Sequence, residues 1–137
     1  MTETLLAFDY GEKHIGVAVG QTLTRTANPL ESIRVSGAQP DWSAITRMVE
    51  TWQPDALVVG LPLNMDGSEQ NVTGQARRFG NQLSGRYRLP VHLVDERLST
   101  REARERLASA GRAGEADHPV AAQIILESWL SEQKPAQ

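Results

Sequence analysis

Three acidic residues, Asp9, Glu96 and Asp117, stand where a predicted strand ends or a predicted helix begins. Side chains at the carboxyl ends of buried strands lie at the mouth of an α/β sheet, where such sheets bind their ligands. Carboxylates that share one site repel each other and raise each other's pKa unless a cation neutralises them. Mg²⁺ prefers such oxygen ligands and keeps open water positions. If the three acids meet, the sequence therefore predicts a divalent-metal site.

Such a site would suit phosphodiester hydrolysis. Two divalent ions roughly 4 Å apart can activate a water molecule and stabilise the leaving oxygen. Each acid also has an ordinary structural interpretation: Asp9 can accept hydrogen bonds from its own turn, and Glu96 can face solvent near arginines. Asp117 can cap a helix that carries Pro119 in its first turn. Because consecutive strand residues point to opposite faces, at most one of Asp95 and Glu96 is expected to face Asp9.

The elements that would position these acids form a simple order. Three leading strands with short links predict an antiparallel meander, whereas later strands separated by helices are expected to pair in parallel. Residues 36–40 are expected to interrupt the chain before the first helix. The predicted strands cover residues 5–10, 15–19, 30–35, 56–61 and 91–94, and the predicted helices begin near Asp41, Ser68, Ser99 and Asp117. We therefore expect an α/β fold with a mixed five-stranded sheet flanked by helices.

Length and composition restrict the class of protein. A chain of 137 residues predicts one domain, residues 1–137, which is large enough to bury a hydrophobic core without disulfides or structural metals. The chain has no cysteine, which excludes disulfides, thiolate zinc sites and cysteine nucleophiles. Apolar runs are far shorter than the roughly 20 residues of a membrane span. Since the first residues also lack the features of a signal peptide, we expect a cytoplasmic protein without a membrane partner.

The charge of the chain is unevenly distributed. The net charge is −3, yet residues 75–112 contain nine arginines and four acids, so that this stretch carries +5 and the remainder −8. This asymmetry permits nucleic-acid binding on one face, although a solvated helical surface with paired charges would show the same pattern. Arg97, Arg101 and Arg104 follow the predicted acidic strand end closely. Because arginine can fork onto phosphate oxygens, these three are candidate nucleic-acid-binding residues.

Five short motifs, taken together and in this order, resemble those of the bacterial YqgF (RuvX) family. They are Asp9-Tyr10-Gly11, Ile-Gly-Val-Ala at 15–18, the Gly-Leu-Pro segment at 58–68, Asp-Glu-Arg-Leu-Ser-Thr at 95–100, and Asp117 followed by Ala121-Ala122. They span almost the whole chain, and the Gly-Leu-Pro segment is highly specific. The family has a ribonuclease H-like fold. It is described as a nuclease that matures the 5′ end of precursor small-subunit (16S) ribosomal RNA, and was earlier described as a Holliday junction resolvase.

The resemblance implies a metal-dependent nuclease. Asp9, Glu96 and Asp117 would be both its catalytic acids and its metal ligands, with Mg²⁺ or Mn²⁺, two ions in all, as the cofactor. Structured RNA, in particular precursor rRNA, would be the substrate, with branched DNA as the alternative. We expect the protein to be a monomer or a weak homodimer.

The chain departs from the family pattern in two places. The family often carries a basic pair ahead of Ile15, where this chain has Lys13 and His14. Lys13 is itself a candidate nucleic-acid-binding residue. The family also often carries lysine just ahead of the last acid, where this chain has Gly-Glu-Ala at 114–116. These departures concern substrate contacts and leave the three acids in place.

Two other classes of function remain open. Actin-like sugar kinases also place Asp-x-Gly in a first hairpin to bind ATP phosphates, but they need two such domains and more than twice this length. The second alternative is a non-catalytic nucleic-acid-binding factor for ribosome maturation that has a vestigial site. The presence of all three acids speaks against it. A nuclease assay on precursor RNA and on four-way DNA junctions would separate these possibilities.

Overall fold

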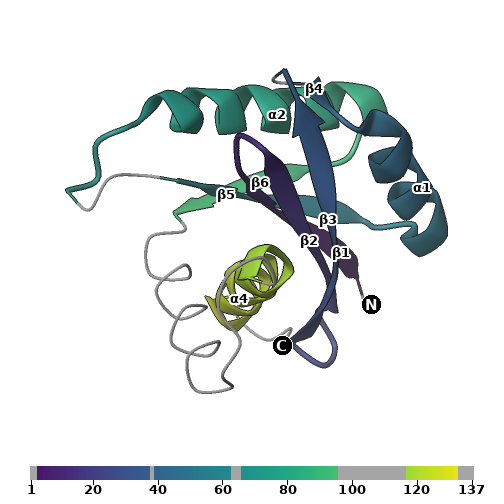
Figure 1. The fold of residues 1–137 in the computed structure, drawn as a ribbon. Helices are drawn as coiled ribbons and strands as arrows, with labels where there is room; N and C mark the ends of the chain where they lie inside the picture. Colours follow the sequence, from purple (N-terminus) through teal and green to yellow (C-terminus); the bar gives the residue numbers. More distant parts are fainter. Residues whose placement is uncertain (1–2, 38, 63–65, 96–116, 133–137) are drawn as a thin grey trace.

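A six-stranded mixed sheet forms the centre of the molecule in the computed structural model, which describes residues 3–37, 39–62, 66–95 and 117–132 (Figure 1). The strand order is β4-β3-β2-β1-β5-β6. The strands are β1 (Thr4–Tyr10), β2 (His14–Gln21), β3 (Thr26–Ser36), β4 (Gln39–Pro40), β5 (Ala56–Leu61) and β6 (Val91–Asp95). β1 to β4 are joined antiparallel in sequence order, while β5 pairs in parallel with both β1 and β6. The predicted meander and parallel strands are therefore confirmed.

Helices cover both faces of this sheet. Helices α1 (Trp42–Trp52) and α2 (Asn71–Tyr87) lie on one face, and α4 (Asp117–Glu132) lies on the other (Figure 1). The helix predicted to begin at Ser99 lies outside the described residues. Within the described part of the chain, no helix has the length and apolar character needed to cross a membrane.

The sheet has one strand more than the sequence predicts. Gln39 and Pro40 form β4 by pairing with the end of β3, where an interruption of the chain was expected. Gly37 has a φ of 57°, a left-handed conformation that glycine adopts without steric cost, so the chain can turn back after β3. The prediction of five strands was wrong because a two-residue strand offers no periodicity from which it could be recognised.

β3 also begins four residues earlier than the predicted residue 30. Its first part pairs with β2 through Thr26, Ala27, Asn28 and Pro29. The pairing shifts between Gly16 and Ala18 of β2, and Pro29 lies at that irregularity, where a missing backbone N–H is tolerated. A proline in an exposed polar segment is typical of a loop, which explains the late predicted start.

Alternation along β1 divides the core into two layers. Leu6, Phe8 and Tyr10 face α1 and α2, whereas Leu5 and Ala7 pack against α4. In the first layer, Phe79 of α2 is buried, and its ring centroid lies 5.5 Å from that of Phe8 and 5.3 Å from that of Tyr10. The second layer contains small residues of the sheet beneath α4. Buried on this side are Leu5, Ala7, Ala27, Ala56, Val58, Ile125, Leu126 and Leu130.

The starts of the two helices on the first face test the capping predictions. Asp41 caps α1 as expected, and its Oδ1 accepts a hydrogen bond from the backbone N–H of Ala44 at 3.3 Å. Ser68 does not cap α2, whose cap position is Gln70. The backbone N–H and the hydroxyl of Ser68 both donate to Oδ1 of Asp66, at 2.9 and 2.6 Å. Ser68 therefore closes a turn that precedes the helix, which is why the predicted start was wrong.

The Gly74→Ala substitution is expected to stabilise the protein. Gly74 is exposed in the interior of α2, and an added Cβ would meet no described heavy atom within 4 Å. Glycine inside a helix costs about 0.5 to 1 kcal/mol relative to alanine. We expect the free energy of unfolding in urea to rise by that amount. Gly80→Ala is the matched control, because its Cβ would lie 3.1 Å from Leu93 Cδ2 and should gain less. A loss of stability at Gly74 would contradict the expectation.

Candidate active site

Asp9 lies at the carboxyl end of β1, one residue before the strand ends. Its register partners are Gly16 in antiparallel β2 and Gly60 in parallel β5. Because Asp9 alternates with Leu5 and Ala7, its half-buried side chain lies on the α4 face of the sheet. The sequence predicts Asp9 at a strand end, and the structure places it near the carboxyl end of β1, a central strand of the sheet.

Both cross-strand neighbours of Asp9 are glycines, so neither contributes a side chain beside the carboxylate. At Gly16, the backbone of α4 takes the space. A Cβ added there would overlap the carbonyl group of His118 and lie 2.8 Å from the nitrogen of Pro119. The first turn of α4 therefore rests directly on the strand pair that carries Asp9.

Of the other two predicted acids, Asp117 lies at the same end of the sheet through its backbone. Asp117 is the first residue of α4, as predicted, and it immediately precedes the residue that contacts Gly16. The side chain of Asp117 and the whole of Glu96 lie outside the described residues. Among the side chains that the structure does describe, no group of three His, Asp or Glu residues could hold a metal ion. The start of α4 therefore lies against the strand pair that carries Asp9.

The direction of Asp95 follows from its neighbours in β6. Val91 and Leu93 lie toward α2, since a Cβ on Gly80 would come within 3.6 Å of Val91 Cγ1 and 3.1 Å of Leu93 Cδ2. His92 lies on the opposite face, where its ring centroid is 4.9 Å from that of Trp129 in α4. Alternation therefore places the exposed Asp95 on the α2 face, away from the side that carries Asp9.

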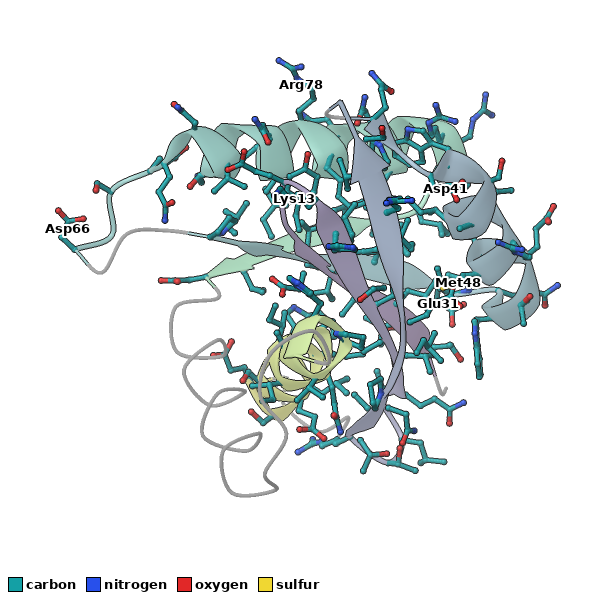
Figure 2. The ribbon with its side chains drawn as sticks, in the orientation of Figure 1. Lys13, Glu31, Asp41, Met48, Asp66 and Arg78 are labelled. Carbon is teal, nitrogen blue, oxygen red and sulfur yellow. The ribbon has the colours of Figure 1, made fainter. Side chains whose placement is uncertain are left out.

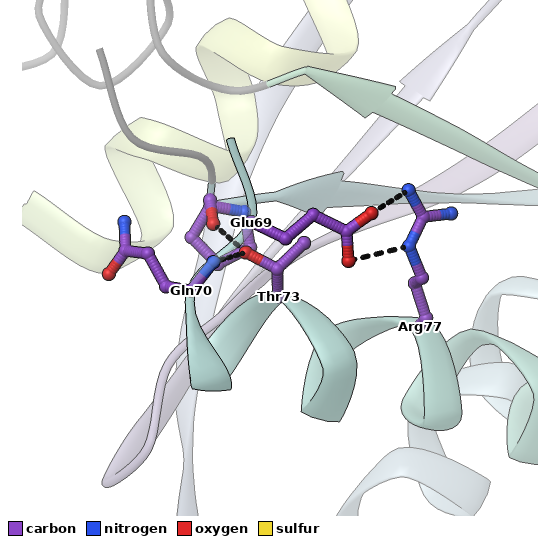
Figure 3. Close-up of polar contacts among 5 residues, drawn as sticks. Glu69, Gln70, Thr73 and Arg77 are labelled. Carbon is purple, nitrogen blue, oxygen red and sulfur yellow. Dashed lines mark hydrogen bonds and ion pairs between the residues drawn. The ribbon is translucent and has the colours of Figure 1, made fainter. Parts of the chain in front are cut away.

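The end of β5 is fastened to the start of α2 by Thr73, as Figure 3 shows. The Thr73 side chain is completely buried; its hydroxyl donates to the carbonyl of Pro62 and accepts from the backbone N–H of Gln70 at 2.9 Å. A surface ion pair between Glu69 and Arg77, at 2.8 Å, lies beside it. Sequence reasoning missed Thr73, because the usual capping box has Ser or Thr at the cap position and Glu or Gln three residues later, whereas here the cap is Gln70 and the third residue is Thr73.

Basic side chains gather beside the β1–β2 turn. Lys13, which Figure 2 labels at this turn, lines an open hollow of about 400 Å³ together with His14 and Arg34. The ring centroids of His14 and His118 are 5.6 Å apart, so this turn also contacts the start of α4. Lys13 was predicted as a nucleic-acid contact. Arg34 was missed because its approach to the turn depends on the register of β2 and β3. The predicted Arg97, Arg101 and Arg104 lie outside the described residues.

The fold is that of the ribonuclease H-like nucleases. It is similar to Thermus thermophilus RuvC in complex with a Holliday junction substrate, with a TM-score of 0.58, 18% sequence identity and 93% of both chains covered. A second structure of the Thermus protein gives a TM-score of 0.54 at 15% identity, again over 93% of both chains. At these identities the likeness shows the fold alone.

Sequence comparison identifies the family. The family model RuvX, described as Holliday junction resolvase, matches residues 3–132, and the chain therefore belongs to the RuvX family of nucleases. A relative from Nitrosococcus oceani is 54% identical over 134 residues, which cover 95% of this chain and 88% of that protein. One from Aeromonas hydrophila subsp. hydrophila is 50% identical over 137 residues, covering 96% and 97%. Both carry the name "Putative pre-16S rRNA nuclease". The resemblance noted in the sequence is confirmed.

Proposed function

We propose that this protein is a divalent-metal-dependent nuclease that hydrolyses phosphodiester bonds in structured RNA and processes the 5′ end of precursor 16S rRNA. The observation that carries the proposal is the setting of Asp9. This carboxylate lies near the carboxyl end of a central strand, between two glycines on the adjacent strands, and the first turn of α4 packs on one of them. The names of the relatives from Nitrosococcus and Aeromonas support the choice of RNA.

Asp9, Glu96 and Asp117 would hold Mg²⁺ or Mn²⁺. Three carboxylates form an all-oxygen donor set, which suits hard cations of this kind. The glycines on both sides of Asp9 leave the sheet surface beside it without side chains. Because Asp95 is on the α2 face, a regular continuation of β6 would place position 96 on the same face as Asp9. Two bound ions would supply water activation and stabilisation of the leaving oxygen.

The remaining tasks belong to residues of the chain itself. α4 would hold Asp117 against the strand pair of Asp9, while Thr73 keeps the end of β5 in place beside Gly60. Arg97, Arg101 and Arg104 would bind the sugar-phosphate backbone close to the acids, since arginine pairs well with phosphate oxygens. An acidic protein needs such a local basic region to hold a polyanion.

Cleavage of branched DNA is the second candidate function. The description of the RuvX family as Holliday junction resolvase favours it, and the fold shared with RuvC is compatible with it. The same acids and metals would serve either substrate, because the scissile group is a phosphodiester in both.

Removal of the metal is expected to abolish cleavage. The purified protein would be incubated with 16S rRNA that carries its 5′ extension, and in parallel with a four-way DNA junction. We expect RNA cleavage with Mg²⁺ or Mn²⁺, none in EDTA, and recovery when Mn²⁺ is returned, since the carboxylates alone cannot activate water in this way. Cleavage in EDTA would overturn the metal mechanism. Cleavage of the junction but not of the RNA would show that branched DNA is the substrate. Binding of either substrate without cleavage would indicate a non-catalytic factor.

A further inference from the structure

The open hollow beside the β1–β2 turn is built by two segments that the sheet brings together. Lys13 and His14 come from the turn and the start of β2, and Arg34, Val35, Ser36 and Gly37 come from the end of β3. His14 and Arg34 are direct register partners, and the backbone N–H of Val35 donates to the carbonyl of Lys13 at 2.8 Å. The position of the basic groups is therefore set by the sheet itself.

The lining of the hollow is suited to an anion. It offers the ammonium group of Lys13, the guanidinium of Arg34, the imidazole of His14 and the hydroxyl of Ser36, and none of its described lining residues carries a carboxylate. Within the described part of the chain, neither Lys13 nor Arg34 has an ion-pair partner, because Arg77–Glu69 is the ion pair found there.

Glu12, the carboxylate that precedes Lys13 in the turn, is not among the described lining residues of the hollow. Burial raises the pKa of the Tyr10 phenol, the charge of Glu12 raises it further, and Arg78 lowers it.

Two of the lining residues, His14 and its register partner Arg34, lie on the face of the sheet that carries Asp9. His14 precedes Gly16, the partner of Asp9, by two residues in β2, and its ring contacts that of His118 in the first turn of α4. From Asp9 to Arg34 the sheet spans about 7 Å along the strands and about 10 Å across them. Successive nucleotides of one strand in a duplex advance by about 3.4 Å, so this separation corresponds to a few nucleotides.

We propose that this hollow, lined by Lys13, His14, Arg34 and Ser36, binds a backbone phosphate of the substrate strand a few nucleotides from the scissile bond. The inference rests on the proposed nuclease function and adds to it a second contact that fixes the strand relative to Asp9. Arg34 and Lys13 pair with the phosphate charge, and His14 and Ser36 donate hydrogen bonds. Such a contact recognises the backbone and not the base, so it would serve RNA and branched DNA alike.

The test is a binding measurement that needs no turnover. Fluorescence anisotropy would follow labelled precursor 16S RNA, and separately a labelled four-way DNA junction, in EDTA over a series of salt concentrations. Loss of one charged hydrogen-bonding contact is expected to weaken binding of Arg34→Ala by about 10-fold. The slope of log affinity against log salt should fall in magnitude by about 0.7 to 0.9, since one phosphate contact is lost. Arg34→Lys should keep the slope, because the charge is retained.

Arg47→Ala is the matched control. It removes the same charge from an exposed position on α1, on the opposite face of the sheet, and should leave affinity and slope unchanged. Arg34 is exposed, so its variants should keep the melting temperature of the parent protein. An equal loss in both alanine variants would show a general charge effect and overturn the inference, as would unchanged binding of Arg34→Ala.

The outcome is separable from that of the proposed function. If Arg34→Ala binds normally while cleavage still depends on metal, the second contact is wrong and the nuclease function stands. If the protein binds RNA through Arg34 but cleaves nothing, the contact stands and catalysis is wrong. If the parent protein binds neither probe, both are overturned.

Discussion

Asp9→Asn is expected to reduce the rate of cleavage by more than about 100-fold, because changes even to groups that only support metal ligands cost 10- to 100-fold. The amide keeps the volume of the carboxylate but removes the negative charge that a divalent ion requires. The side chain is only half-buried and lies between two glycines, so the fold should tolerate the change. The measurement is the initial rate with saturating Mn²⁺ on whichever substrate the parent protein cleaves, together with a thermal melt.

Asp95→Asn is the matched control for this substitution. It makes the same chemical change at the end of β6, a parallel strand separated from β1 by β5, but on the α2 face and at an exposed position. We expect it to keep full activity, while Glu96→Gln should lose it. An active Asp9→Asn would refute the proposed metal site. Inactive Asp95→Asn with active Glu96→Gln would show that the two acids have exchanged roles.

The sequence predicts the central strands well because burial leaves a direct pattern there. Residues 56–61 form a continuous apolar run and are buried on both faces of the sheet, and β5 occupies that range without a shift. Asp41 was likewise predicted as the cap of α1, since capping depends only on residues three or four apart. Where the determining contacts are local, sequence and structure agree.

The disagreements fall where distant segments decide the outcome. Thr26 to Pro29 form a strand because they pair with β2, and Gln39 and Pro40 form one because they pair with the end of β3. Neither segment has an apolar alternation of its own. Ser68 was predicted as a helix cap, but its backbone N–H and its hydroxyl both donate hydrogen bonds to Asp66. Local preference was overridden in each case by a partner that the pattern alone does not specify.

The same division applies to the candidate site. Asp9 could be predicted from its place at the end of a buried strand. The approach of Arg34 to the β1–β2 turn could not, because it depends on the pairing of His14 with Arg34. The importance of Gly16 also emerges only from the structure, in which α4 packs against it. The candidate catalytic residues can thus be proposed from the sequence, whereas the contacts around them, such as that between Gly16 and α4, require the fold.

Gly16→Ala is expected to impair cleavage although it adds a single methyl group and changes no charge. A Cβ at this position would overlap the backbone of His118, and a backbone group cannot rotate away as a side chain can. The start of α4 would have to shift, and Asp117 would shift with it, away from Asp9. Because a displacement of 1 Å can cost about 100-fold in rate, we expect a loss of about 10- to 100-fold per folded molecule. The apparent affinity for Mn²⁺, measured from the metal dependence of the rate, should fall as well.

Gly20→Ala separates this effect from a general loss of stability. Gly20 lies on the same strand and the same face, and its Cβ would approach Leu126 Cδ2 and the carbonyl oxygen of Thr26 to 2.8 Å. Overpacking of this kind typically costs about 1 to 3 kcal/mol, so both variants should unfold at lower urea concentrations. Gly20→Ala adds its methyl group beneath the middle of α4, and its activity per folded molecule should remain that of the parent. If both variants have the same activity per folded molecule, the position of the first turn of α4 does not govern catalysis. If only Gly16→Ala loses activity, the result supports Asp117, on that turn, as an acid of the site.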